Sequence, residues 1–206
     1  MELEKWVSMG GRVFDSVIKL QKSCSKSVDT VPPITTHNMV YEDDPILTNL
    51  RRCRLLNHCH DRVKVIFHPQ FLTSNNALLP IDYTDFIKGC DLGVFPSYYE
   101  PWGYTPVECI SMGIPCISTN LSGFGRFMED LNIAHLGQQH GVYVVDRRFQ
   151  SLEESILQLR DIMFYQTGLS RLEGIVQRQH TLSLSHYHDW SNVYPAYQKA
   201  RAMASK

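Results

Sequence analysis

The chain has 206 residues, of which 43% are hydrophobic and 20% are charged. This apolar content suffices for a packed core and excludes a chain that is disordered throughout. Twenty basic against 21 acidic residues give a net charge of -1, which argues against an extended basic surface for nucleic acid. No run approaches the about 20 apolar residues of a membrane helix, and the acidic start is unlike a secretory signal. We therefore expect an intracellular protein that binds neither nucleic acid nor membranes.

The first 30 residues are expected to form an N-terminal helix and a linker. Apolar residues recur at helical spacing between positions 2 and 22, although Gly10 and Gly11 weaken this helix. Serine and lysine dominate 22–30, as in many linkers. Pro32 and Pro33 then predict an extended segment, because proline disfavours helix at itself and before itself.

After the prolines, helices and strands are expected to alternate. Helix signals, such as an aspartate before Pro45 at a helix start, predict helices at 43–58, 82–89 and 105–113. Apolar, β-branched runs predict strands at 63–67, 92–97, 115–119 and 142–145. Strands that alternate with helices need crossover connections. The predicted fold is therefore α/β, with a Rossmann-like parallel sheet covered on both faces.

A longer helix is predicted for 151–165. Ser151 and Glu154 have the spacing of a capping box at its start. One side of this helix is expected to carry the apolar residues Leu152, Ile156, Leu159 and Met163. The predicted organisation is an N-terminal helix and linker at 1–30, a Rossmann-like lobe at 31–165 and a helical extension at 166–206.

The stretch 89–125 carries the chemistry. A strand ends near Ser97, a loop of aromatic residues, proline and glycine follows, and a helix is predicted from Thr105. Ligands collect at the carboxyl ends of parallel strands, and a helix N-terminus offers N–H groups and a positive dipole to an anion. Because Gly103 has no side chain, a phosphate can approach the backbone there. The stretch predicts a diphosphate site, without the glycine patterns of dinucleotide or Walker-type sites.

Two acidic residues lie near this site, eight positions apart. Glu108 is three residues after Thr105, which is the spacing of a capping box, so a structural role and a ligand contact are both open to it. Glu100 lies in the loop beside tyrosines and a proline. A carboxylate next to aromatic rings suits a sugar, because carboxylates accept hydrogen bonds from hydroxyl groups and rings stack on C–H faces.

An E-x(7)-E pair follows the strand VFPS within YYEPWGYTP, and STNLSGFG comes after it. Further blocks along the chain are PPITTHN, DPIL, DRVKVIFHP, LLPIDY and DRRF. In their sequence and order, these motifs resemble those of eukaryotic glycogen synthase. The resemblance implies the C-terminal, nucleotide-binding lobe of a two-lobe (GT-B type) glycosyltransferase. Such an enzyme transfers glucose from UDP-glucose to the non-reducing end of an α-1,4-glucan and retains the anomeric configuration.

The resemblance also implies roles for individual residues. Glu100 would lie at the reacting glucose as the catalytic residue, Glu108 would bind the ribose, and Tyr83 would stack on the uracil. The remaining donor-binding positions are Trp102, Gly103, Tyr104 and Thr105, with the diphosphate on the backbone from Gly103 to Thr105. No metal ion or organic cofactor is expected.

The chain departs from the family pattern at its regulatory helix. The family senses glucose 6-phosphate through an Arg-rich helix that matches about 169–182, where Arg171 and Arg178 remain. Asp91 stands where the family has a histidine that contacts this effector, and a carboxylate repels a phosphate. We therefore expect weak or no activation by glucose 6-phosphate, with Arg178 as the candidate effector contact.

Two further departures concern the catalytic parts. The Arg/Lys pair with which the family neutralises the donor diphosphate lies upstream of the matched region, and nothing in 1–30 resembles it. We therefore expect the isolated chain to be an incomplete enzyme. Gln70 stands where the family has a glutamate.

The resemblance implies glycogen and a self-glucosylating primer protein as partners, a cytoplasmic location, and a homo-oligomer for a full-length member. Two alternatives remain open at this point. The chain could be a non-catalytic short protein that binds a nucleotide sugar or associates with synthase subunits. It could also belong to a retaining transferase with a different sugar donor.

Overall fold

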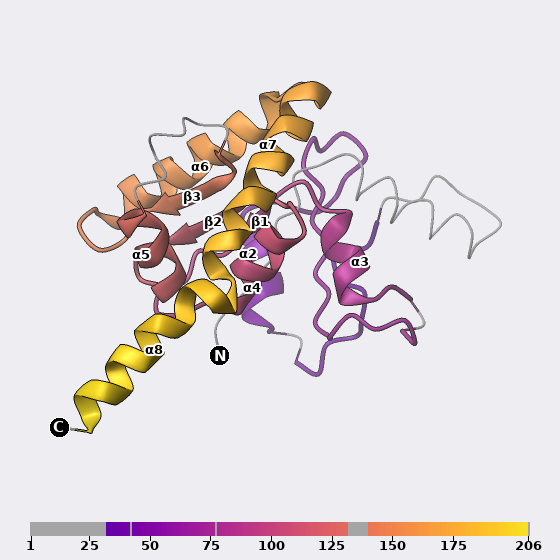
Figure 1. Cartoon of the computed structure of the whole chain (residues 1–206). Helices are drawn as coiled ribbons and strands as arrows, with labels where there is room; N and C mark the ends of the chain where they lie inside the picture. Colours follow the sequence, from indigo (N-terminus) through magenta and orange to yellow (C-terminus); the bar gives the residue numbers. More distant parts are fainter. Residues whose placement is uncertain (1–31, 42, 77, 132–139, 206) are drawn as a thin grey trace. The chain divides into compact units, whose positions relative to one another are not determined.

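The computed structural model describes residues 32–41, 43–76, 78–131 and 140–205 (Figure 1). The chain divides into two compact units between Phe86 and Ile87, and each unit is described by itself. The helix and linker predicted at 1–30 lie outside the described residues. Within these four ranges, no helix is long and apolar enough to cross a membrane.

The unit that follows Phe86 is built on a three-stranded parallel sheet with the strand order β1–β2–β3 (Figure 1). Its strands are β1 (Gly93–Val94), β2 (Cys116–Thr119) and β3 (Val142–Val145). β2 is the central strand, and its residue Ile117 pairs with Val94 of β1 and with Tyr143 of β3. The α/β fold and three of the predicted strands are therefore confirmed, although β1 is shorter than the stretch 92–97.

Helices cover both faces of this sheet. One face carries the core residues Leu92, Val94, Ile117, Tyr143 and Val145. Against them α6 (Leu152–Gly168) packs Leu159, Ile162, Met163 and Tyr165. Side chains alternate between the faces of a strand, and Cys116 faces the other side. Its Sγ lies 4.0 Å from the carbonyl oxygen of Pro106 in α4 (Tyr104–Ser111).

The start of α6 is as predicted, but only two of the four apolar residues expected on its buried side, Leu159 and Met163, pack against the core. Ser151 and Glu154 form the capping box. Leu152 and Ile156 are 59% and 54% exposed. The reason lies in Ser155, which is buried and donates a hydrogen bond from Oγ to the carbonyl oxygen of Asp146 at 2.7 Å. This serine takes the inward position of the first turn, so the two apolar neighbours face outward.

Of the remaining helices of this unit, one lies between two strands in the sequence and the others come after the sheet. α5 (Gly123–Asp130) connects β2 towards β3, and α7 (Arg171–Leu184), the short 3-10 helix η3 (Ser185–His188) and α8 (Trp190–Ala204) form the C-terminal part. α7 packs closely on the end of α4, since a Cβ at Gly113 would lie 3.1 Å from the carbonyl oxygen of Arg178.

The unit before Ile87 contains α2 (Pro45–Arg52) and the start of α3 (Tyr83–Lys88). Asp44 caps α2 as expected, because its Oδ1 accepts hydrogen bonds from the amides of Ile46 and Leu47 at 2.8 and 3.1 Å. The helix is shorter than the predicted 43–58. Arg54 and Asn57 adopt positive φ angles of 56° and 59°, which a right-handed helix does not accommodate.

The strand predicted at 63–67 is not formed. Only Phe67 makes a single bridge, to Thr35. The carboxamide of the buried Asn57 instead binds both backbone groups of Val65, with distances of 2.8 Å from the Val65 amide and 2.7 Å to its carbonyl oxygen. Since a side chain occupies the place of a neighbouring strand, this segment forms no ladder.

Candidate functional site

The loop that carries Glu100 lies across the first turn of α5. The amide of Glu100 donates to the carbonyl oxygen of Leu121 at 3.3 Å. In return, the amides of Gly123 and Phe124 donate to the carbonyl oxygens of Glu100 and Trp102 at 3.0 and 2.7 Å. The loop is thus held by three backbone hydrogen bonds at the carboxyl ends of β1 and β2, where parallel sheets bind ligands.

Two glycines make this close approach possible. A Cβ at Gly123 would lie 2.2 Å from the carbonyl oxygen of Pro101, and one at Gly125 would lie 2.0 Å from that of Thr119. Ser122 caps α5 by accepting a hydrogen bond from the Gly125 amide at 2.9 Å. The glycines of the segment SGFG are therefore required because two backbone segments meet there, which the sequence alone did not reveal.

The N-terminus of α4 has a different structure from the one predicted. The helix begins at Tyr104 with Gly103 as its N-cap residue at a φ of 104°, so Thr105 is the second helical residue. The predicted capping box of Thr105 and Glu108 is therefore wrong. Gly103 reaches the left-handed region without a Cβ penalty, which lets the helix start one residue earlier. Pro106 then falls in the first turn, where its missing N–H is tolerated.

This arrangement leaves α4 as the helix terminus suited to an anion. The first amides of α5 are already bonded to loop carbonyls and to Ser122. The N-cap residue of α4 is Gly103, which has no side chain and so makes no capping hydrogen bond. Because Pro106 has no N–H, the backbone N–H donors at this end belong to Gly103, Tyr104 and Thr105. They match the backbone that the sequence assigns to a diphosphate.

The structure brings most of the predicted donor residues to this terminus. A Cβ at Gly103 would lie 3.4 Å from Cγ of Glu100, so the Glu100 side chain runs beside the start of α4. Tyr104 is 75% exposed. Glu108 lies one turn further along the same helix and is half-buried. The acidic pair and the amides predicted to bind a diphosphate thus share one loop and one helix.

Trp102 packs into the protein. Its ring lies 5.7 Å from that of Phe127 in α5 and 5.9 Å from that of His188 in η3. Burial lowers the pKa of His188, which keeps this imidazole neutral at pH 7 and suited to aromatic packing. In the structure Trp102 therefore shapes the loop by anchoring it to α5 and to the C-terminal segment.

The motif DRRF was matched to the family from the sequence, but the contacts that Arg147 makes were not predicted. Its Nη1 donates to the carbonyl oxygens of Pro96 and Ser97 at 2.6 and 3.4 Å, and its guanidinium lies 5.0 Å from the Tyr98 ring centre. Arg147 thereby joins the end of β3 to the start of the loop 96–103, which carries Glu100 and is called the donor loop after its predicted ligand. The signal available was a basic residue directly after a strand, at the edge where ligands bind.

Two neighbours hold Arg147 in place. The Nδ2 of Asn120 donates to Asp146 at 2.6 Å, and Oδ1 of Asn120 accepts from the Arg147 amide at 2.9 Å. The hydrogen bond from Asn120, together with those from backbone amides, lowers the pKa of the Asp146 carboxyl. The two segments that follow β2 and β3 are therefore tied to each other.

The other two predicted residues lie elsewhere. Tyr83 is the first residue of α3, in the unit before Ile87, and its contact with uracil stays a prediction. Arg178, on α7, donates from Nη2 to the Cys90 carbonyl oxygen at 2.6 Å and forms an ion pair with Asp91 at 3.3 Å. The residue expected to contact an effector phosphate is thus already bound to a carboxylate.

Cysteine chemistry is not supported at this site. Burial raises the pKa of the Cys109 and Cys116 thiols, which are both buried, and raises that of Cys90 to about 11. These thiols stay protonated at pH 7 and are not nucleophiles. Over the described ranges, no group of three or more His, Cys, Asp or Glu side chains is arranged to hold a metal ion.

Comparison with known proteins places this chain in a family. A sequence model described as "Glycogen synthase" matches residues 13–206. The chain is 51% identical over 187 residues to "Glycogen [starch] synthase" of Caenorhabditis elegans, covering 90% of this chain and 28% of the relative. It is 52% identical over 174 residues to isoform 1 of Saccharomyces cerevisiae, with coverages of 84% and 25%. For the human liver protein the identity is 49% over 190 residues, with coverages of 91% and 26%.

Among solved structures, the chain is similar to WaaG, a glycosyltransferase involved in lipopolysaccharide biosynthesis. The TM-score is 0.39 at 20% identity, over 67% of this chain and 30% of that one. The chain spans about a quarter of the length of the curated relatives it matches. Since the family model matches nearly the whole chain and the relatives are about half identical to it, the chain belongs to the glycogen synthase family.

Proposed function

We propose that this chain supplies the donor-nucleotide-binding lobe of a UDP-glucose-dependent, retaining glucosyltransferase that extends an α-1,4-glucan. The observation that carries the proposal is the N-terminus of α4, which begins at the N-cap residue Gly103 and lies beside Glu100 on a loop bonded to α5. Such a terminus suits the diphosphate of a nucleotide sugar. The family relationship supports the choice of UDP-glucose as donor.

The proposed mechanism assigns each group one task. The amides from Gly103 to Thr105 hold the diphosphate. The bond between the glucose C1 and the β-phosphate oxygen breaks, and UDP leaves with the electron pair. The 4-hydroxyl oxygen of the glucan then bonds to C1 from the same face, and its proton passes to the leaving diphosphate. Glu100 orients the sugar and stabilises the positive charge that develops on it, while Glu108 binds the ribose.

Backbone donors can be tested with proline. Tyr104→Pro removes one amide at the first helical position, which proline tolerates, whereas Tyr104→Ala keeps that amide and reports the share of the side chain. By calorimetry, we expect UDP to bind the chain and Tyr104→Pro to weaken binding at least about tenfold more than Tyr104→Ala, as for a hydrogen bond to a charged group. Equal UDP affinities of the two variants would overturn the proposed diphosphate site.

Transfer itself is tested with labelled UDP-glucose and glycogen. Nothing in residues 1–30 resembles the Arg/Lys pair of the family, so we expect no label in glycogen from this polypeptide alone and transfer only when the remainder of a family member is present. Transfer by the polypeptide alone would contradict this account of the donor site. Partnership with a primer protein, homo-oligomerisation and a cytoplasmic location rest on the family resemblance and stay predictions.

A further inference from the structure

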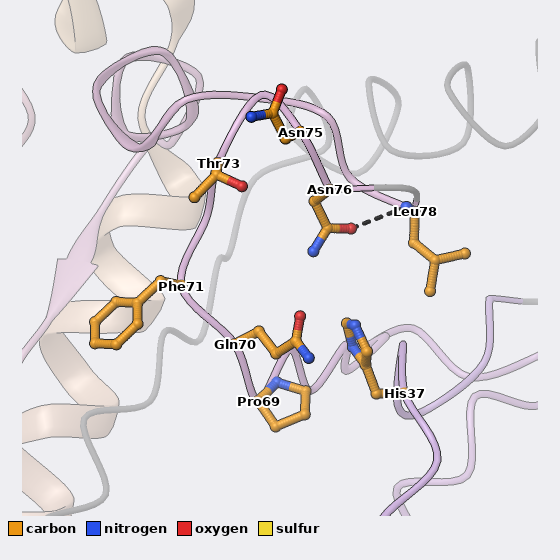
Figure 2. Close-up of a pocket in the computed structure, with 8 residues that line it drawn as sticks. All are labelled: His37, Pro69, Gln70, Phe71, Thr73, Asn75, Asn76 and Leu78. Carbon is orange, nitrogen blue, oxygen red and sulfur yellow. Dashed lines mark hydrogen bonds between the residues drawn. The ribbon is translucent and has the colours of Figure 1, made fainter.

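The hollow shown in Figure 2 belongs to the unit before Ile87 and is lined by His37 and by side chains between Pro69 and Leu78. No carboxylate, lysine or arginine is among these lining residues. The lining therefore offers no charge by which a ligand could be identified, and we assign no ligand to the hollow. The aromatic rings around His188, in the other unit, carry a more specific inference.

His188 belongs to a cluster of aromatic rings that come from three segments of the chain. Its ring stacks on Phe124 with the ring centres 5.3 Å apart and meets Phe127 edge to face at 5.1 Å, and both phenylalanines belong to α5. Trp102 of the donor loop completes the cluster, 5.9 Å from His188 and 5.7 Å from Phe127. Aromatic rings at such distances attract each other beyond the area that they bury. The cluster therefore connects the 3-10 helix η3 to the donor loop.

His188 takes part in this cluster through its ring rather than through strong hydrogen bonds. Both imidazole nitrogens are buried, and neither makes a hydrogen bond of normal geometry within the part of the chain that the structure describes. Burial lowers the pKa of His188 and outweighs the opposing effects of the Leu184 backbone and the Asp189 carboxylate, so the imidazole is neutral at pH 7. Buried nitrogens without strong partners cost stability. What this side chain contributes is therefore its contact with the neighbouring rings.

The segment that carries His188 is held by neighbours outside the donor loop. Leu184, the last residue of α7, is buried directly before η3. Nδ2 of Asn192 in α8 donates to the carbonyl oxygen of His186 at 2.7 Å, and the imidazole of His186 lies 2.7 Å from the Asp189 carboxylate. Because α7 and α8 hold η3 from both ends, its ring can serve as a fixed support for the donor loop.

Trp102 transmits this support to the backbone at the start of α4. Its carbonyl oxygen accepts a hydrogen bond from the Phe124 amide at 2.7 Å, so α5 binds both its backbone and, through Phe127, its side chain. That carbonyl and the N–H of Gly103 belong to one planar peptide group and point in opposite directions, because the bond is trans. The position of Trp102 therefore determines where the Gly103 N–H points.

We propose that His188 is a positioning residue of the donor site. Its ring holds the side chain of Trp102, Trp102 keeps its carbonyl oxygen on α5, and the shared peptide plane fixes the direction of the Gly103 N–H, one of the donors assigned to the diphosphate. The effect of His188 on the ligand is indirect, through another residue. This inference rests on the proposed function, which assigns the diphosphate to these amides.

The test is the affinity of the whole chain for UDP, measured by calorimetry. His188→Ala removes the ring and should weaken UDP binding about fivefold, which is the order of one aromatic contact. His188→Asn repeats the loss of the ring with a polar side chain and should weaken binding as much. His188→Phe keeps a ring without the two buried nitrogens, so it should keep the wild-type affinity and raise the melting temperature. His186→Ala removes an exposed imidazole from the same 3-10 helix and should leave the affinity unchanged.

A core variant separates positioning from a general loss of stability. Met163→Ala shortens a side chain that packs from α6 against the core of the sheet, so it should lower the melting temperature and leave UDP affinity unchanged. Hydrogen exchange gives a second readout that needs no ligand. The Phe124 amide, which donates to Trp102, should exchange faster in His188→Ala than in Met163→Ala, because the donor loop is released only in the first variant.

Several results would overturn the proposal. Wild-type UDP affinity in His188→Ala and His188→Asn is one, and equal weakening of UDP binding in His188→Phe and His188→Ala is another. A Met163→Ala variant that loses as much UDP affinity is a third. A chain that does not bind UDP, but whose Phe124 amide exchanges faster only in His188→Ala, would contradict the proposed function and leave the positioning of the loop by His188 standing. Without that faster exchange, both would be overturned.

Discussion

At Gly123 the chain tolerates no side chain, because the Pro101 carbonyl oxygen would lie 2.2 Å from its Cβ. We expect Gly123→Ala to push the donor loop off α5, to break the hydrogen bond from its amide to Glu100, and to cost about 1–3 kcal/mol of unfolding free energy, as overpacking does. Urea unfolding measures the stability, and calorimetry with UDP measures the expected loss of affinity.

Gly174 provides the matched control for this substitution. It lies inside α7, and nothing lies within 4 Å of its Cβ position. Gly174→Ala should stabilise the protein by about 0.5–1 kcal/mol, because glycine is a poor helix former. A Gly123→Ala variant as stable as Gly174→Ala would show that the steric argument at Gly123 is incorrect.

His140 should make the protein sensitive to mild acid. Burial lowers its pKa from 6.5 to about 4, and its Nδ1 accepts a hydrogen bond from the Val142 amide at 3.0 Å. Below pH 6.5 the unfolded chain therefore binds a proton that the folded chain does not, so stability falls as the pH falls towards 4. The loss approaches, as an upper limit, about 1.4 kcal/mol per pH unit. Burial also lowers the pKa of His68 and His188, with the same sign.

This dependence is measured by urea unfolding at about pH 7 and pH 5, a window above the range in which most carboxylates titrate. In His140→Asn the Oδ1 atom can accept the same hydrogen bond without titrating, so the stability of this variant should fall less than that of the wild type. An equal fall in both proteins would assign the acid sensitivity to other groups.

Local signals at single residues predicted structure well, and signals that depend on distant contacts did not. Asp44 and the pair Ser151 and Glu154 cap their helices as expected, because a cap involves only neighbours in sequence. Thr105 carried an equally good local signal and was wrong, because Gly103 could adopt a left-handed conformation that the pattern did not consider.

At the scale of elements, the same limit explains the strand that is missing. The residues 63–67 have strand composition, but Asn57, eight positions before Val65, occupies the pairing position with its side chain. The sequence also indicated a helix terminus for the diphosphate. It placed the diphosphate at the helix that follows Gly103, but it could not show that the first amides of α5 are bonded to the carbonyl oxygens of Glu100 and Trp102. That contact brings together segments about twenty residues apart, beyond the reach of local patterns.

The connection from β3 to the donor loop leads to a prediction for Arg147. Lysine keeps the charge but has no planar fork, so it cannot reproduce the contacts of Arg147 with Pro96, Ser97 and the Tyr98 ring. We expect Arg147→Lys to weaken UDP binding severalfold, by loosening the loop that carries Glu100, and to lower the melting temperature.

Arg148 supplies the comparison within the same dipeptide. Its guanidinium lies 5.2 Å from the centre of the Phe149 ring and is exposed, so Arg148→Lys should leave UDP affinity and melting temperature near those of the wild type. If the two lysine variants behaved alike, the loop would owe its position to the backbone hydrogen bonds at α5 instead.

For the whole molecule, family membership and local geometry contribute different information. The resemblance supplied the roles expected of Glu100, Glu108 and Tyr83, which no distance within the structure assigns. The geometry supplied what the resemblance lacked. It showed that α4 begins at the N-cap residue Gly103, that the glycines of SGFG allow two backbone segments to meet, and that Arg147 binds the carbonyl oxygen of Pro96. The two agree on one location, the loop after β1 and the helix that follows it.

Family resemblance and local geometry together also bear on regulation by glucose 6-phosphate. Ser170 and Glu173 form the capping box that begins α7, with the Ser170 amide bonded to Glu173 at 2.7 Å. The acidic residue Glu173 thus stabilises the start of α7 in a stretch where the family is basic. Arg178, further along this helix, is held by Asp91 and by the Cys90 carbonyl oxygen. A phosphate would have to displace a carboxylate to reach it, which disfavours binding of glucose 6-phosphate.

A ligand that binds only the folded chain raises its melting temperature in proportion to its binding free energy. We therefore expect UDP, but not an equal concentration of glucose 6-phosphate, to raise the melting temperature. Asp91→His replaces the carboxylate with the residue type of the family and releases Arg178 from its ion pair, so this variant should gain a response to glucose 6-phosphate while its response to UDP is kept. A clear shift of the wild type with glucose 6-phosphate would mean that Asp91 does not block the effector and that the remaining arginines suffice to bind it.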